Sequence, residues 1–566
     1  MNIDVSQVVV IQSISLVVFI LGVWLSWRTD KFICVMGTIL GGAVWWMARF
    51  HSLFFWEEVT EYRLGTYIVR TLWLEGAHNV STWWGGSLYP AEGWSDWVAW
   101  TSAVAAVVPI WALLLIYLYL TRGNSFVRGS VIIPIDTIHK KLRKMAARIP
   151  VFIGGLPLPE SLETRSLALL GEPGTGKTQI IKRMLGCIFK RNDRVVAIDV
   201  GGELYSQFGR QGDCVLSVST EETERWSPFA DIAGPEDCTS MANVLIPSGE
   251  GEAATWNSYT RTLLSNILQK VWETGERKNS DIIFYAQSAT VDELKQLLQG
   301  TSSQRLFEPG SERMLSNVLS ILSSYMEPLR YLDENAGEAD FSLKAWLTDD
   351  HCQGWLWVVY DDETGSATAS LRTAWIDILT RTALSLEPDG DRRIWFFLDE
   401  LASLGKVEIL SQALARGRKY GLGLVLGIQN ISQLFSIYGR DEALSILGSV
   451  GHTAILRTPD PETADYLSRT IGETEVTRDQ YTRSGNSVSS TEVQETKRVV
   501  LASEIAQLPD RQGYLKIAGV GWTQLKVSVT EFKGRMSLTP IKRKYHLGTV
   551  GIVSSDHTSV NDIDDL

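Results

Sequence analysis

Two long uncharged runs lie within the first 120 residues. Residues 8–27 form the first run, of 20 residues, and residues 97–120 form the second, of 24. Helices of these lengths span about 30 and 36 Å, enough to cross the hydrocarbon core of a bilayer. A cleaved signal peptide is the alternative for the first run, but the residues before it carry no basic side chain. We therefore predict two membrane-spanning helices.

A third apolar run leaves the number of spans open. Residues 32–48 are only 17 residues long and include three glycines. If this run spans, the N-terminus lies outside and there are three spans. If it lies at the interface, there are two. The basic Arg28 and Lys31 favour three spans, whereas the short length favours two.

Charged residues predict which side of the membrane each segment occupies. Residues 121–150 carry seven Lys or Arg against one acid, whereas residues 51–96 hold six acids and two arginines. Loops rich in Lys and Arg stay in the cytoplasm. We expect a periplasmic segment at 51–96 and a cytoplasmic location for everything after the second span.

From about residue 150 onward, short apolar runs alternate with helical patterns. Each run is bounded by polar or glycine residues, which is typical of strands buried on both faces of a parallel sheet. The pattern predicts an α/β fold with helices on both faces. The expected strands are 166–170, 194–199, 354–360, 393–400, 423–429 and 453–457, with two further strand-like runs at 513–518 and 524–529.

The two phosphate-site motifs described below are 222 residues apart, which is more than a few strand–helix units require. The intervening chain contains helical patterns at 238–246, 258–273, 290–299 and 312–332. We predict an all-α domain at 236–345, inserted into a nucleotide-binding domain made of 126–235 and 346–535. The other domains would be a membrane anchor, 1–125, and a C-terminal tail, 536–566. The polar stretch 478–497 is expected to be a loop.

Composition excludes several classes of protein. The chain of 566 residues has a net charge of −12, so it is not a general polycation that coats DNA. Its five cysteines are scattered without a C-x-x-C pair, which argues against a zinc site or a disulfide framework.

The candidate chemistry begins with a phosphate-binding loop. The segment Gly-Glu-Pro-Gly-Thr-Gly-Lys-Thr matches G-x-x-x-x-G-K-[ST], follows an apolar strand and precedes a helical pattern. A plain glycine-rich turn would leave the strand and the Lys-Thr pair unexplained. Lys177 can reach the β- and γ-phosphates, and Thr178 can ligate Mg²⁺. The predicted nucleotide-binding residues are Gly171, Glu172, Pro173, Gly174, Thr175, Gly176, Lys177 and Thr178.

Asp399 and Glu400 end the strongest apolar run and resemble a Walker B motif. Asp399 would hold Mg²⁺ through water, and Glu400 would polarise the water that attacks the γ-phosphate. The second acid favours an ATP hydrolase over a kinase. Gln429, at the end of the next strand, could sense the γ-phosphate or orient the water. An acidic strand end that caps a helix is the alternative for Asp399 and Glu400.

Arg416, Arg418 and Lys419 end the helical pattern after this motif. Cations at a helix C-terminus are favoured by the helix dipole alone. The other interpretation is an arginine finger that reaches the nucleotide of a neighbouring subunit.

Several motifs in order resemble the type IV coupling proteins of bacterial conjugation, in particular their TraD branch, within the larger group of VirD-type and FtsK/HerA P-loop motors. The likeness extends from about residue 8 to 530. Its motifs are the P-loop, Ala242–Pro247, Arg330–Leu332, Trp395–Leu401, Gly417–Gly421 and Gly427–Gln429.

The resemblance implies a homo-hexameric RecA-like motor ring on the inner membrane. Such a ring binds ATP and Mg²⁺, couples a relaxase–DNA complex to a type IV secretion channel and drives transfer of single-stranded DNA. It also implies contacts with relaxosome proteins, channel subunits and membrane lipid. Arg418 matches the family arginine that acts in trans, and Arg165 matches another that precedes the P-loop strand. The family's C-terminal tail binds a relaxosome protein, but the tail here is short.

Two other functions remain open at this stage. A double-stranded DNA translocase of the FtsK/HerA type shares the motor core but lacks the large helical insertion. A docking receptor that gates protein substrates would use nucleotide only for assembly. The intact Glu400 argues against this second function.

Overall fold

The computed structural model describes residues 125–541, except 146–148, 192, 250, 276, 333–340, 353 and 485–486. The predicted spans at 8–27, 32–48 and 97–120, and the periplasmic segment between them, lie outside the described residues. Among the helices of the described part, none is both long and apolar enough to cross a bilayer.

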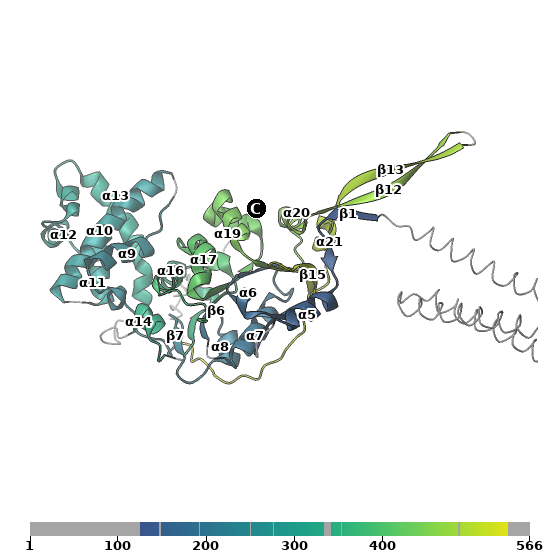
Figure 1. Cartoon of the computed structure of the whole chain (residues 1–566). Coiled ribbons are helices and arrows are strands. Elements are labelled where there is room, and N and C mark those ends of the chain that lie inside the picture. The colour runs from purple at the N-terminus through teal and green to yellow at the C-terminus, as the bar shows by residue number, and fades with distance from the viewer. Residues whose placement is uncertain are drawn as a thin grey trace, which may run out of the picture. The chain divides into compact units, whose positions relative to one another are not determined.

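One large sheet organises the described part of the chain, where it contains ten strands (Figure 1). The seven strands from β11 to β7 run parallel, β14 is antiparallel to β11, and β15 and β2 complete the other edge. The predicted parallel α/β arrangement is confirmed. In spatial order the strands are β2 (Ile132–Ile133), β15 (Gly521–Lys526), β14 (Gln512–Ile517), β11 (His452–Ile455), β5 (Leu167–Leu170), β10 (Leu422–Ile428), β9 (Ile394–Leu398), β6 (Arg194–Val200), β8 (Leu356–Tyr360) and β7 (Cys214–Leu216).

The strands fold this way because both faces of the sheet are buried. Along β9, Ile394, Phe396 and Leu398 enter one hydrophobic cluster, and Trp395 and Phe397 enter the other. Side chains alternate between faces along a strand, so an uninterrupted apolar run supplies both cores.

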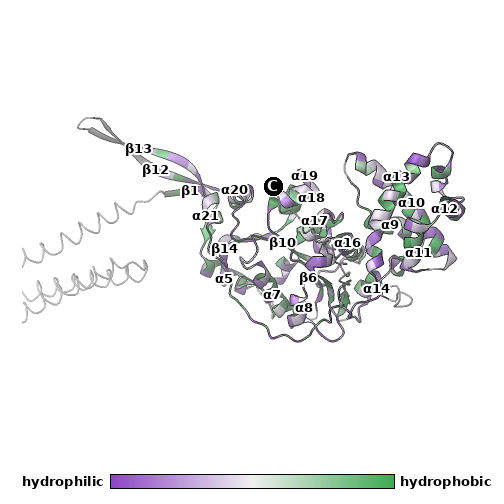
Figure 2. Cartoon of the chain, turned by 180° about the vertical axis from the view of Figure 1, so that it is seen from behind, coloured by the Kyte–Doolittle hydropathy of each residue, from purple (hydrophilic) through white to green (hydrophobic). Residues whose placement is uncertain are grey.

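Helices cover both faces and carry hydrophobic and hydrophilic residues side by side along their length (Figure 2). The first face packs against α5 (Ile135–Arg143), α7 (Lys177–Ile188) and α8 (Glu203–Phe208). The second packs against α16 (Ala369–Ser385), α17 (Leu410–Arg416), α18 (Ile431–Tyr438), α19 (Arg440–Ser449) and α20 (Pro461–Ile471). Shorter elements are α6 (Glu160–Glu163), α14 (Leu343–Thr348), α15 (Asp362–Gly365), α21 (Ala502–Ala506) and the paired strands β3 (Val151–Ile153) and β4 (Leu156–Leu158).

A group of helices separates β7 from β8 in the sequence and gathers beyond α16 (Figure 1). We call α9 to α13 the helical segment. Its helices are α9 (Pro235–Leu245), α10 (Glu252–Thr274), α11 (Asn279–Ile283), α12 (Val291–Leu297) and α13 (Glu312–Met326). Its apolar side chains belong to the same cluster as the second face of the sheet. The predicted domain boundaries remain predictions.

The prediction of a loop at 478–497 is wrong. Strands β12 (Glu473–Ser484) and β13 (Ser487–Arg498) occupy this stretch, in a three-stranded sheet with β1 (Ser125–Gly129). The stretch is polar, which suggested a loop, but it also contains three Thr, two Val and one Tyr, residues that favour extended backbone. Pairing between neighbouring strands satisfies their backbone groups.

After β15 the chain runs back along the large sheet and its helices as an extended segment, residues 527–541, which we call the C-terminal strap (Figure 1). The ring of Phe532 packs on Phe208 of α8, with centroids 4.6 Å apart. Farther along, the Glu221 amide donates a 2.9 Å hydrogen bond to the Thr539 carbonyl. The strap thus connects α8 with the chain just after β7.

Candidate nucleotide site

Three neighbouring strands bring the predicted motifs together. Strands β5, β10 and β9 lie side by side, with Leu170 beside Ile428 and Leu426 beside Leu398. Because carboxyl ends of parallel strands meet at one edge, the P-loop after β5, Gln429 after β10 and Asp399 after β9 share that edge.

The P-loop curls through left-handed backbone at two glycines. Gly174 has φ 79° and Gly176 has φ 114°, values that side chains with a Cβ rarely adopt. Lys177 is 7% exposed, and its ammonium donates hydrogen bonds to the carbonyls of Gly171, at 2.5 Å, and Glu172, at 3.1 Å. The Thr175 hydroxyl donates to the same Glu172 carbonyl at 2.7 Å. The loop therefore holds its lysine at the start of α7.

An ion pair anchors the start of this loop to the next strand. Glu172 accepts a 2.5 Å hydrogen bond from Arg457, just beyond β11, and Arg457 also pairs with Asp510 at 2.7 Å. The backbone repeats the link, since the Glu172 amide donates to the Arg457 carbonyl at 3.0 Å. Glu172 therefore contributes to the shape of the loop.

Thr178 and Asp399 form a pair that suits a magnesium ion. The Thr178 hydroxyl donates to Asp399 Oδ2 at 3.1 Å, while Asp399 Oδ1 is buried and accepts no hydrogen bond within the described part of the chain. Burial raises the pKa of Asp399, and the bond from Thr178 and the charge of Lys177 oppose this. A cation beside Oδ1 would satisfy the orphaned oxygen. No cluster of three or more His, Cys, Asp or Glu that could hold a metal occurs among the described residues, and Mg²⁺ at phosphates needs only one or two carboxylates.

Glu400 lies against Gln429. The Gln429 side-chain amide donates a short hydrogen bond to the Glu400 carboxylate. Burial raises the pKa of Glu400, with opposing effects from this bond and from Lys177. Burial has the opposite effect on the cation and lowers the pKa of Lys177, while the charges of Asp399 and Glu400 raise it. An acid whose pKa is raised at a strand edge can accept a proton from an attacking water.

The motifs line one cavity of about 680 Å³. Sequence reasoning missed its far wall, to which Tyr360, Arg372 and Ser403 contribute. Tyr360 could have been found, because it ends a predicted strand of the same sheet; Arg372 and Ser403 carry no local signal. The lining consists of Pro173, Gly174, Gly176, Lys177, Thr178, Gln179, Val200, Tyr360, Asp362, Gly365, Ser366, Ala369, Arg372, Asp399, Glu400, Ser403 and Gln429.

The two candidate arginines lie at the opposite edge of the sheet. Arg418 is exposed in the 3₁₀ helix η8 (Gly417–Tyr420), just before β10. Arg165 is half-buried just before the neighbouring β5, and its Nε has no hydrogen-bond partner within the described residues. Neither lines the cavity. Both arginines therefore lie away from the nucleotide cavity of their own chain.

Comparison with protein families identifies the fold. The family model described as "Type IV secretion-system coupling protein DNA-binding domain" matches residues 150–528. The chain belongs to the type IV secretion-system coupling proteins. The coupling protein TraD of Escherichia coli (strain K12) is 28% identical over 394 residues, which are 68% of this chain and 55% of TraD. The chain spans about half the length of the first curated relatives it matches.

Solved structures agree with this assignment. The bacterial conjugative coupling protein TrwBdeltaN70 in its unbound monoclinic form is 33% identical, covers 73% of this chain and 96% of its own, and has a TM-score of 0.68. The plasmid coupling protein TrwB in complex with ADP and Mg²⁺ is 32% identical, with the same coverage and a TM-score of 0.67. This coupling protein thus shares the α/β fold of TrwB.

Proposed function

We propose that this coupling protein is a membrane-anchored ATPase that transports DNA in bacterial conjugation, linking a relaxase–DNA complex to a type IV secretion channel. The observation that carries the proposal is the pairing of Thr178 with Asp399 beside Glu400 at the mouth of the P-loop. Solved TrwB structures with a non-hydrolysable ATP analogue and with ADP and Mg²⁺ support ATP and Mg²⁺ as the ligands.

The residues of the site divide the chemistry among them. The P-loop amides and Lys177 would bind the β- and γ-phosphates. Thr178 would ligate Mg²⁺ and Asp399 would hold it through water; the bound ion neutralises phosphate charge. Glu400 would take the proton of the attacking water, and Gln429 would keep that carboxylate in place. The large helical segment favours this function over an FtsK/HerA-like motor.

The assembly completes the proposal. Subunits form a hexamer, so that Arg418, and in a lesser role Arg165, approach the nucleotide of a neighbour and stabilise charge on the γ-phosphate. The predicted spans at 8–27 and 97–120 would hold the ring at the inner membrane, in contact with lipid, with the motor in the cytoplasm. Single-stranded DNA passes without sequence preference, bound through its backbone.

Steady-state ATP hydrolysis by the full chain, with and without single-stranded DNA, tests this function. We expect hydrolysis that DNA stimulates, and at least a 100-fold loss of turnover in Lys177→Ala and Glu400→Gln, since each removes a group acting on the transition state. Stronger stimulation by double-stranded DNA would favour an FtsK/HerA-like translocase. Hydrolysis unaffected by any DNA would favour a nucleotide-gated docking receptor.

A further inference from the structure

Helix α16 lies between the nucleotide cavity and the helical segment. Arg372, in its first turn, contributes to the cavity wall although only 2% of its surface is exposed. Within the described residues no carboxylate pairs with its guanidinium, and burial lowers its pKa. Burying an unpaired cation is costly, so an aliphatic side chain would serve plain packing better. The position of Arg372 calls for a specific role.

Two contacts of Arg372 lead toward the turn that carries Glu400. Its guanidinium stacks on the Tyr360 ring, 3.8 Å from the ring centre, and Nη2 donates to the Ser403 carbonyl at 3.0 Å. The Tyr360 hydroxyl bonds the Ser403 hydroxyl at 2.9 Å. The Ser403 hydroxyl in turn donates to the Glu400 carbonyl at 2.8 Å. We call Arg372, Tyr360 and Ser403 the arginine clamp.

The clamp acts on Glu400 through the backbone. Ser403 belongs to the 3₁₀ helix η7 (Leu401–Leu404), which begins directly after Glu400. Nη1 of Arg372 is also engaged, by the hydroxyl of Thr368 at 2.8 Å. One face of the guanidinium is stacked and both terminal nitrogens are bonded, whereas Nε has no hydrogen-bond partner within the described residues. These contacts suit a positioning group for η7.

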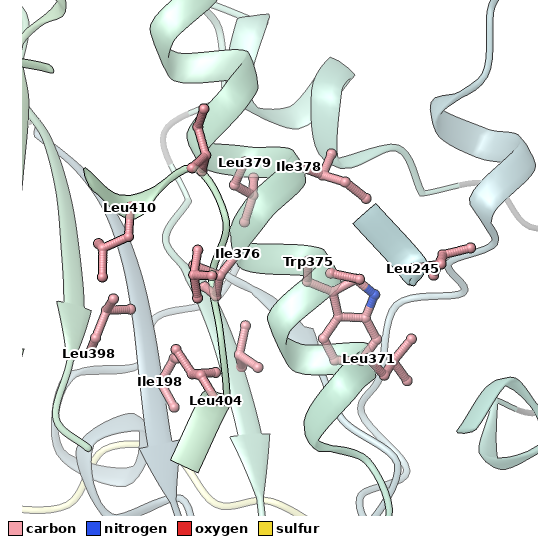
Figure 3. Packing of buried hydrophobic residues seen from close by; sticks show 14 of the residues in the cluster. Ile198, Leu245, Leu371, Trp375, Ile376, Ile378, Leu379, Leu398, Leu404 and Leu410 are labelled. Atoms are coloured by element: carbon pink, nitrogen blue, oxygen red, sulfur yellow. The ribbon is translucent and has the colours of Figure 1, made fainter. Parts of the chain in front are cut away.

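The other side of α16 faces the helical segment. In Figure 3, Leu371 and Trp375 extend from α16 toward Leu245 of α9, whereas Ile376 lies on the side of Leu398 in the sheet. Elsewhere on α16, the Thr373 hydroxyl donates a hydrogen bond to the Leu404 carbonyl at the end of η7. A shift of the helical segment would therefore displace α16, the helix that positions η7.

We propose that the arginine clamp holds Glu400 in its working position and that α16 makes this position dependent on the helical segment. The inference rests on the proposed hydrolysis of ATP. Close-packed elements shift as units, so packing on both sides of α16 offers a route by which movement of the helical segment would reach η7.

Kinetics of the full chain test the clamp. Turnover and the affinities for ATP and ADP are measured for Arg372→Met, Arg372→Lys and Tyr360→Phe, with the exposed Arg313→Met as the control substitution. We expect about a tenfold loss of kcat in both Arg372 variants, because lysine lacks the planar fork, and about threefold in Tyr360→Phe, with nucleotide Kd changed less than about threefold. The double variant Arg372→Met/Tyr360→Phe should lose little more than Arg372→Met alone, since both act through η7.

Several results would overturn the inference. One such result is an unchanged kcat in both Arg372→Lys and Tyr360→Phe. These two variants test the inference even if Arg372→Met fails to fold. Another is a tenfold loss of affinity for ATP with ADP unaffected, which indicates direct contact with the γ-phosphate. Absence of hydrolysis in the unaltered chain would instead contradict the proposed function.

Hydrogen exchange tests the link to the helical segment. We expect binding of a non-hydrolysable ATP analogue to change amide exchange in α9 of the unaltered chain and to leave α9 unchanged in Arg372→Lys. A response of α9 that persists in Arg372→Lys would refute the coupling through the clamp.

Discussion

The hydroxyl of Thr178 donates a 3.1 Å hydrogen bond to Asp399, a residue 221 positions away in the sequence. This bond fixes the spacing between the P-loop helix and the end of β9. Thr178→Val keeps the shape of the side chain but removes the oxygen that both Asp399 and Mg²⁺ would use. We expect turnover to fall by about 100-fold with a higher requirement for Mg²⁺, because charge on the phosphates is less well neutralised. Thr178→Ser keeps the hydroxyl and should stay within about threefold of the unaltered chain, measured by ATP hydrolysis across a magnesium titration.

Gly427 allows β10 to lie directly against the end of β9. A Cβ at this position would overlap the backbone carbonyl of Asp399. We expect Gly427→Ala to displace Asp399, to lower the free energy of unfolding by about 3 kcal/mol and to abolish hydrolysis. Gly448→Ala is the matched control, because its Cβ meets nothing within 4 Å. Urea unfolding and ATP hydrolysis of both variants check this; a fully active Gly427→Ala would contradict the close approach of the two strands.

His452 predicts a loss of stability in mild acid. It is buried between the Leu162 carbonyl, at 2.9 Å, and the Ala518 amide, at 3.3 Å, and burial lowers its pKa from 6.5 to about 4. Between these two values the unfolded chain binds more protons than the folded chain. The free energy of unfolding therefore rises with pH across this window, and the contribution is complete above pH 6.5.

Substitution of this histidine separates its contribution from those of other groups. The contribution lost as pH falls toward 4 is about 3 kcal/mol. Urea unfolding at pH 5 and pH 7 should show a smaller difference in His452→Gln than in the unaltered chain. The exposed His351→Gln should keep the full difference, and an equal difference in all three proteins would show that His452 is not the group responsible.

The position of Arg418 predicts that two inactive variants restore each other. Arg418 lies before β10, at the edge of the sheet away from its own cavity. Chains with Lys177→Ala keep Arg418, and chains with Arg418→Ala keep an intact P-loop. Mixed in one assembly, they should recover up to about a quarter of the unaltered turnover, the share of interfaces with both groups intact at equal mixing. Absence of recovery in mixed assemblies would place the arginine outside the shared site.

Local patterns predicted the parts of the site that are contiguous in sequence. The strand Ile394–Leu398 was predictable because burial on both faces demands an unbroken apolar run. The P-loop was predictable because its glycines and Lys177 lie within eight residues. The shared edge of P-loop, Glu400 and Gln429 followed from the parallel arrangement, although the register that joins Glu400 to Gln429 did not.

What could not be predicted depends on pairing between distant segments. The hairpin of β12 and β13 was missed because its composition is polar and its pairing leaves no apolar pattern. The arginine clamp was missed because Tyr360, Arg372 and Ser403 come from a strand, a helix and a 3₁₀ turn that meet only in the folded chain. A single Arg among apolar helix residues has no neighbours in sequence that reveal its contacts.

The C-terminal strap has a consequence for how the acidic end of the chain can be removed. Gly186 of α7 leaves room for the ring of Phe532, since a Cβ there would come within 2.8 Å of the ring. Helix α7, which begins with Lys177, is thus supported by Phe532, a residue of the C-terminal strap. Deleting residues 542–566 spares this contact. Deleting from residue 527 removes it, and the phosphate-binding helix would lose its support although its own sequence remains intact.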